Sequence, residues 1–331
     1  MHRPARTLAV AVTAVLTVAL SACGGDGSGS TSGADATTAN DDATTSSSPA
    51  PAAGEATFPV TVDAENGEVT IEQRPERIVS LSPSATEILF AIGAGDQVIA
   101  ADQFSTYPEE APATDLSGFD PNVEAVVGYE PDLVVVSNDA NDLVASLGEL
   151  DIPVLVQGAP MDVESGYDLV AGLGQATGHV DETAEVVATM RAEMEEAFAA
   201  APDAEGIRVY HELDDTFFSA ASSSFIGSIY KEMGAVNIAD EADTEGTGYP
   251  QLTEEAVVEA NPQLIVITDQ VAYTAEDVAA RPGWDEIDAV KNGNIVTVDA
   301  DIASRWGPRL PQLVASIADA LTKAAAVPAG R

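Results

Sequence analysis

Short apolar runs alternate along the chain with segments whose apolar positions recur at helical spacing. Runs of that length, flanked by turn residues, are typical of buried strands. Strands that alternate with helices in this order predict a parallel sheet covered on both faces, which is the α/β fold class. Predicted strands cover residues 77–81, 97–101, 153–156, 207–211 and 295–298.

One helix and strand unit occurs twice in the chain. Residues 124–139 read EAVVGYEPDLVVVSND, and residues 255–270 read EAVVEANPQLIVITDQ. Each copy predicts a short helix that opens with a glutamate, then a turn marked by proline, then a buried strand. A unit repeated at domain-sized spacing, rather than every few dozen residues, predicts two similar lobes with a crevice between them.

The longest uninterrupted helical pattern lies between the two halves. Residues 180–200 contain no glycine or proline, and their apolar positions follow the helical period. These positions are Val186, Val187, Met190, Met194 and Phe198. A long helix at this place predicts a stiff connector between the lobes.

Capping and turn patterns indicate where the first elements begin. Asn66 and Gly67, between two short alternating runs, predict the turn of a small hairpin. After the first predicted strand, Ser84 and Glu87 match a capping box, with Ser84 as the N-cap.

The two glutamates that open the repeat copies also lie near predicted helix starts. Residues 120–121, Asp and Pro, predict the N-cap and first position of one helix, and Thr253 predicts the N-cap of the other. Glu124 and Glu255 then fall in or near a first turn. A carboxylate there can simply offset the helix macrodipole, which stabilises a helix by about 0.3–1 kcal/mol.

The N-terminus is typical of an exported lipoprotein. Arg3 and Arg6 precede a short apolar run over residues 8–20, which ends in Leu-Ser-Ala-Cys at Cys23. Cys23 is the only cysteine, so an intramolecular disulfide is excluded and acylation at the cleavage site explains it. Residues 24–56 are rich in Gly, Ser, Thr, Ala, Asp and Pro, which predicts a disordered tether.

These patterns divide the 331 residues into five predicted parts. They are a signal peptide (1–22), an acylated disordered tether (23–56), an N-terminal lobe (57–178), a connecting helix (179–201) and a C-terminal lobe (202–331).

The chain is strongly acidic. It has 13 Lys and Arg against 55 Asp and Glu, a formal net charge of −42. Such a surface repels nucleic acid and anionic membranes, so we expect no nucleic-acid partner and membrane contact only through a lipid anchor. Adaptation to high salt explains this charge better than a functional acidic patch does.

From about Arg74 to Leu321 the chain resembles the substrate-binding lipoproteins of ABC importers for cobalamin and ferric siderophores. The likeness rests on RIVSLSPSATE at residues 77–87, both repeat copies, the middle helix, and RPGW at residues 281–284. The resemblance implies two Rossmann-like lobes with mostly parallel central sheets, joined by a single long rigid α-helix and holding the ligand between them.

The same resemblance implies a transport role. The protein would be an extracytoplasmic monomer, anchored by lipid to the outer face of the cytoplasmic membrane, with no resident cofactor and no enzymatic activity. It would deliver a small-molecule ligand to an ABC permease dimer with its ATPase subunits. In the family, one glutamate on each lobe docks on the permease, and these match Glu124 and Glu255.

The resemblance also implies ligand-binding residues. Tyr107, Tyr249 and Arg305 match pocket positions of cobalamin-binding members. A tryptophan of that family is absent here, and Phe119 stands in its place. We add Trp306, because an aromatic residue beside Arg305 on a loop rich in Gly and Pro is hard to bury in a core, although it could also plug the loop.

The scarcity of basic residues bears on the ligand. Arg305 and Arg309 are the cations available to the crevice, whereas a multiply anionic ferric catecholate needs several. We therefore rank a cobalamin-like corrinoid first, a ferric hydroxamate siderophore second and haem third. His211 or a pocket tyrosine would be the axial ligand for haem.

Other classes of protein remain open from sequence. A hydrolase would need a nucleophile motif, and the chain has neither a G-x-S-x-G elbow nor a P-loop. Residues 211–215, HELDD, are the best metal-like cluster, but strand alternation separates His211 from Glu212, which favours solvated loop carboxylates and no metal site. A lipid-anchored surface or signalling lipoprotein would lack a ligand crevice or a permease partner.

Overall fold

The computed structural model describes residues 57–200 and 204–326. The predicted signal peptide and tether, with Cys23, lie outside this range, so their assignment and the domain boundaries stay predictions. In the part of the chain that the structure describes, no helix combines the length and apolar character needed to cross a bilayer.

The N-terminal half contains a four-stranded parallel sheet with the strand order β4-β3-β5-β6. A separate antiparallel hairpin precedes it, as the Asn66-Gly67 turn predicted. The strands are β1 (Val60–Ala64), β2 (Gly67–Ile71), β3 (Ile78–Leu81), β4 (Val98–Ala101), β5 (Leu133–Val136) and β6 (Val154–Val156). The helices are α1 (Pro83–Ala91), α2 (Val123–Val127), α3 (Leu143–Gly148) and α4 (Val163–Thr177).

The C-terminal half repeats this plan, with a parallel sheet in the order β10-β9-β7-β8. In each four-stranded sheet, the strand that comes first in the sequence lies between the second and the third, so the two sheets have the same strand order. The strands are β7 (Arg208–His211), β8 (Val236–Asn237), β9 (Leu264–Thr268) and β10 (Ile295–Val298). The helices are α6 (Phe225–Glu232), α7 (Glu254–Ala260), α8 (Ala275–Ala279), α9 (Asp288–Asn292), α10 (Ala300–Ser304) and α11 (Leu310–Ala325).

The predicted repeat is confirmed as structure. The first copy forms α2 and β5, and the second forms α7 and β9. Both strands are fully buried at their centres, which explains their uniform apolar sequence. The α/β class and the parallel sheets are likewise confirmed.

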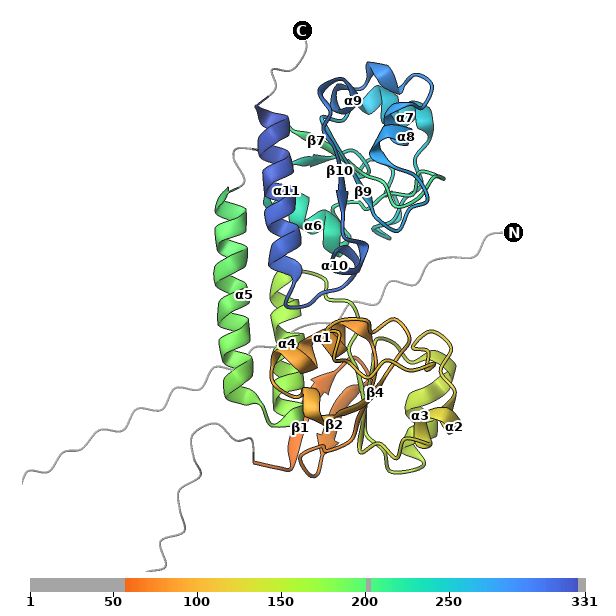
Figure 1. The fold of residues 1–331 in the computed structure, drawn as a ribbon, viewed down its shortest axis with the longest axis vertical. Coiled ribbons are helices and arrows are strands. Elements are labelled where there is room, and N and C mark those ends of the chain that lie inside the picture. Colours follow the sequence, from red (N-terminus) through yellow and green to blue (C-terminus); the bar gives the residue numbers. More distant parts are fainter. Residues whose placement is uncertain (1–56, 201–203, 327–331) are drawn as a thin grey trace, which may run out of the picture. The chain divides into compact units, whose positions relative to one another are not determined.

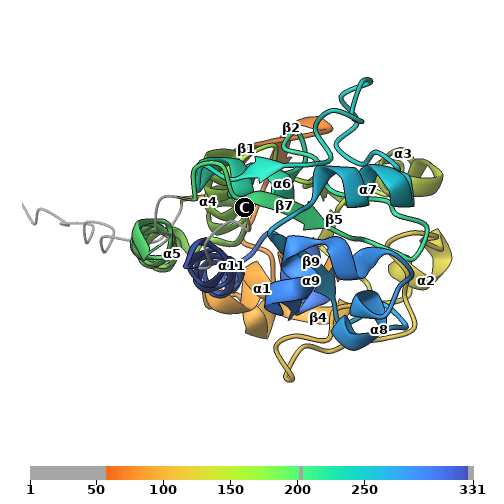
Figure 2. The same ribbon diagram turned by 90° about the horizontal axis from the view of Figure 1, so that it is seen from above.

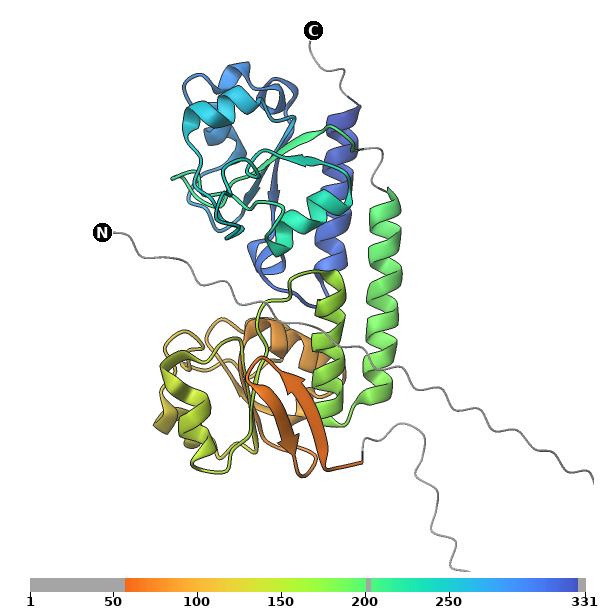
Figure 3. The same ribbon diagram turned by 180° about the vertical axis from the view of Figure 1, so that it is seen from behind.

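A helix of 21 residues, α5 (Val180–Ala200), lies where the connector was predicted. Helices α4 and α11 pack along it, one from each half (Figures 1 and 3). Viewed from above, α2, α3, α7 and α8 lie on the side opposite α5 (Figure 2). The expectation of a single rigid helix as the connection is not confirmed, because α5 is one member of a packed group of three.

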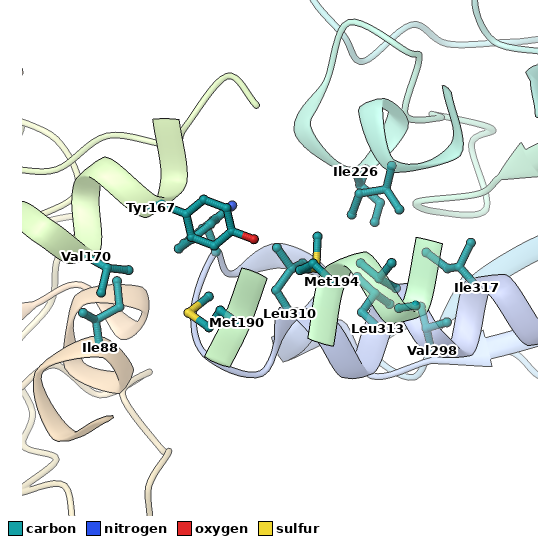
Figure 4. Close-up of a cluster of buried hydrophobic side chains, with 14 of the residues drawn as sticks. Ile88, Tyr167, Val170, Met190, Met194, Ile226, Val298, Leu310, Leu313 and Ile317 are labelled. Carbon is teal, nitrogen blue, oxygen red and sulfur yellow. The ribbon is translucent and has the colours of Figure 1, made fainter. Parts of the chain in front are cut away.

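One apolar core extends through this helix group. Met190 and Met194 of α5 lie between Ile88 and Val170 of the N-terminal half and Leu313 of α11 (Figure 4). Two further cores cover the other faces of the sheets, one under α2 and α3 and one under α7, α8 and α9. The two sheets therefore share one core and each has one of its own.

Two capping predictions are wrong. The N-cap of α1 is Ser82, whose hydroxyl accepts from the amide of Ala85 at 3.3 Å, so Glu87 closes no capping box. In α2 the N-cap is Asn122 rather than Asp120. In each case a nearby residue, Ser82 or Asn122, has the extended backbone and the side-chain oxygen that an N-cap needs, and it takes that position instead. The prediction for Thr253 is confirmed, because its hydroxyl accepts from the amide of Ala256.

Candidate functional site

A cavity of about 650 Å³ opens at the carboxyl ends of strands from both sheets. Its lining includes residues that directly follow four of these strands: Ser82, Ser137, Leu213 and Gln270 come shortly after β3, β5, β7 and β9. Open parallel sheets bind ligands at this edge because loops rather than helices surround it. The volume lies in the range of small-molecule sites. The crevice predicted between the two halves is therefore present.

Aromatic side chains from both halves line the cavity. Phe119, which is 75% exposed, packs edge to face against Phe104 with ring centroids 5.6 Å apart. Tyr249 lies on the lining from the C-terminal half and is half exposed. Exposed aromatic side chains contributed by both halves are suited to a large ligand with flat apolar surfaces.

Phe104 was not predicted. It follows the strand β4, so its place at the carboxyl end of a sheet strand was the feature that could have revealed it.

Arg305 and Trp306, two of the predicted ligand-binding residues, both line the cavity, but their side chains are also packed into the protein. Trp306 is 3% exposed, and its ring meets Tyr167 of α4 edge to face at 5.4 Å. The loop buries this tryptophan because Gly166 of α4 leaves room for the indole ring. The guanidinium of Arg305 is paired with carboxylates and is largely shielded from solvent.

Tyr107 is not among the residues that line the cavity. It is 45% exposed, and the guanidinium of Arg309 lies 4.1 Å above its ring. The structure thus brings together Phe119, Tyr249, Arg305 and Trp306 and leaves Tyr107 outside this group.

The cavity carries little net charge. Among the described residues that line it, the acidic and basic side chains are His211, Asp301 and Arg305. Burial lowers the pKa of His211 to about 4, so the ring is neutral at pH 7. Asp301 and Arg305 bond each other at 2.7 Å and cancel. Moving a neutral ligand from water into such a site costs less free energy than moving a polyanion there, because the polyanion loses more hydration.

The side chains of the metal-like HELDD cluster do not converge on one point. The described residues contain no group of three or more His, Cys, Asp or Glu that could hold a metal ion. His211 lines the cavity and bonds the hydroxyl of Tyr230 at 2.7 Å. Glu212 is fully buried and pairs with Arg281, so the expectation of solvated carboxylates is wrong for this residue. Strand alternation separates the two side chains, as predicted.

Glu124 and Glu255 occupy equivalent places in the two halves. Each is the second residue of its helix, α2 or α7, and each is exposed. Glu255 borders a shallow hollow together with Glu254, Glu259 and Pro282. The two glutamates lie outside the cavity lining, which suits contact with another molecule rather than with the cavity's ligand.

Known proteins are similar to this chain in sequence and in fold. The model of the periplasmic binding protein family matches residues 78–302. An uncharacterized ABC transporter substrate-binding lipoprotein of Bacillus subtilis is 34% identical, over 80% of this chain and 86% of its own length. A cobalamin-binding protein of Halobacterium salinarum is also 34% identical, over 80% of this chain and 74% of its own length.

The fold is found in solved structures as well. The periplasmic haem-binding protein of Roseiflexus matches with a TM-score of 0.68 and 23% identity, over 76% of this chain and 99% of that one. Likeness at this identity concerns the fold alone. The family model covers more than half of the chain and the relatives cover four fifths of it, so the chain belongs to the periplasmic binding protein family.

Proposed function

We propose that this protein is the extracytoplasmic substrate-binding component of an ABC importer and that its ligand is a cobalamin-like corrinoid. The observation that carries the proposal is a cavity with aromatic lining residues and no net charge, at the carboxyl ends of strands from two duplicated sheets. The cobalamin-binding relative at 34% identity supports the same ligand class. The role needs neither catalysis nor a resident cofactor, and acylated Cys23 would hold the protein at the membrane.

The chemistry of a corrinoid suits this cavity. A corrin is a broad ring with apolar faces and a rim of neutral amides, so it can stack on aromatic side chains and hydrogen-bond at its edge. A ferric hydroxamate is the second candidate, because it too carries little charge. Haem is the third, since its carboxylates would find Arg305 as the lining cation, already paired with Asp301.

Titration with cyanocobalamin tests the ligand. The chain has two tryptophans, of which Trp306 lines the cavity and Trp284 is fully buried elsewhere. We expect saturable quenching of tryptophan fluorescence, and we expect Trp306→Phe to remove most of it. Absence of saturation with corrinoids, together with saturation by a ferric hydroxamate such as ferrioxamine, would transfer the assignment to siderophores. Saturation by neither would contradict both.

We further propose that Glu124 and Glu255 dock on the permease. Exposed carboxylates at equivalent places in two halves could meet basic residues on two related permease subunits, where such pairs set orientation and encounter rate. In the double variant Glu124→Gln and Glu255→Gln, we expect ligand uptake by cells to fall about tenfold or more. We expect the ligand dissociation constant of the purified protein to stay the same.

Glutamates in other first turns provide the control for this experiment. Glu182 of α5 and Glu276 of α8 are exposed and lie in first turns, so they share the macrodipole contribution but not the equivalent placement. Changing both to glutamine should leave uptake intact. Weakened ligand binding in the Glu124 and Glu255 variant would instead assign those residues to the cavity.

A further inference from the structure

A single carboxylate from the N-terminal half is bonded to two arginines from the C-terminal half. Glu87, on α1, is 3% exposed. Its carboxylate accepts from Nε and Nη2 of Arg309, at 2.9 and 2.5 Å, and from Nη1 of Arg305 at 3.3 Å. Both arginines lie between α10 and α11, more than 200 residues along the chain.

Both N–H groups of Nη2 of Arg305 are engaged as well. Its Nη2 donates to Oδ1 of Asp301 at 2.7 Å and to the backbone carbonyl of Phe104 at 3.0 Å. Two guanidinium groups therefore face two carboxylates, and their formal charges cancel. Arg305 and Asp301 line the cavity, whereas Glu87 and Arg309 are not among its lining residues.

This arrangement restricts what Arg305 can do for a ligand. To bond an anion through the N–H groups that Glu87 and Asp301 accept from, the guanidinium would have to leave these carboxylates, and the buried Glu87 would lose part of its charge compensation. An anion that bonded another N–H of Arg305 would lose its hydration and meet a positive charge that is already cancelled. The cost rises with the charge of the ligand.

We propose that Glu87 is a positioning residue that sets the charge selectivity of the cavity: by neutralising Arg305 and Arg309 it excludes multiply anionic ligands and admits neutral ones. The proposal rests on the proposed ligand-binding role of the cavity and adds to it the residue that decides between ligand classes. The proposal predicts that the charge selectivity of the cavity depends on Glu87, a carboxylate that does not contact the ligand.

Comparing Glu87→Gln with Glu164→Gln tests the proposal. Glu164 bonds Arg191 through both carboxylate oxygens, as Glu87 bonds Arg309, but the pair is exposed and outside the cavity lining. The probes are cyanocobalamin, which is neutral overall, and a ferric tris-catecholate, which carries three negative charges. Binding is measured by fluorescence titration at low and at physiological salt.

We expect Glu87→Gln to raise affinity for the trianion about tenfold over Glu164→Gln, because one positive charge becomes uncompensated next to the cavity. This gain should shrink as salt rises. Affinity for cyanocobalamin should stay the same or fall. A purely structural role would weaken both ligands together, so equal losses, or no change for the trianion, would overturn the proposal.

A second variant and the wild-type protein keep the proposal testable even if Glu87→Gln alone does not fold. Adding Arg309→Met to Glu87→Gln removes one charge of each sign, and selectivity should return to that of the wild type. Should Glu87→Gln not fold, the wild type decides: tight trianion binding that weakens with salt overturns the proposal, and absence of such attraction supports it. A wild type that binds no corrinoid refutes the proposed ligand but leaves the trianion comparison valid.

Discussion

Replacing Glu212 by glutamine is expected to lower the free energy of unfolding by about 3 kcal/mol. Glu212 is fully buried, and its two oxygens accept from Nη1 and Nη2 of Arg281 at 2.6 and 2.7 Å. The guanidinium also lies 4.5 Å above the ring of Trp284. Glutamine would keep the volume but leave the arginine charge without its partner in a site that water barely reaches. Urea denaturation followed by circular dichroism measures the effect.

An exposed ion pair of the same half serves as the control. Glu286 and Lys291 form a contact at 3.2 Å, with side chains 75% and 47% exposed. Glu286→Gln is expected to change the free energy of unfolding by less than about 1 kcal/mol, because solvent screens such pairs. Equal effects of the two substitutions would show that burial of the Glu212 and Arg281 pair carries no special weight.

Replacing Gly166 by alanine is expected to destabilise the protein by about 1–3 kcal/mol and to weaken ligand binding. An alanine Cβ at this position would lie 1.9 Å from Cε2 of Trp306, closer than any van der Waals contact allows. The indole ring must then leave its place against α4. Because Trp306 and the neighbouring Arg305 both line the cavity, we expect this displacement to weaken ligand binding as well. Thermal unfolding and a ligand titration of the same variant measure both effects.

Gly172 provides the matched control because it lies in the same helix. Its added Cβ would lie 3.4 Å from the nearest atom, Cγ1 of Val62, which is an ordinary contact. Gly172→Ala is expected to be neutral or to stabilise by up to about 1 kcal/mol, through the higher helix propensity of alanine. If Gly166→Ala behaved in the same way, Trp306 would not depend on the space that Gly166 leaves.

The fold could largely be predicted from local patterns. The buried strand β5 is a continuous apolar segment, and β9 is apolar up to its last residue. The repeat in the sequence indicates the equivalence of the two halves. Helix starts were less predictable, because Ser82 and Ser84 carry the same hydroxyl and only backbone geometry decides which one caps α1. The sequence also gave no indication that α4 and α11 would share the connecting role of α5.

The lining residues of the candidate site were easier to predict from sequence than the contacts between them. The family resemblance gave Phe119, Tyr249 and Arg305, and all three line the cavity. It did not give the partner of Arg305, because Glu87 is 218 residues away and matched a capping pattern. A pairing between distant segments depends on how the two sheets are placed, and no local pattern encodes that placement.

The contact between Glu87 and the segment that carries Arg305, Trp306 and Arg309 also has a consequence for the order of folding. The N-terminal sheet is made from strands that end at Val156, yet this segment, which covers Glu87 and Tyr167, lies close to the end of the chain. Without this segment, a folded first sheet would leave the carboxylate of Glu87 without its arginine partners and Tyr167 without the ring of Trp306. The N-terminal half is therefore complete only after the segment that follows β10 has folded against it.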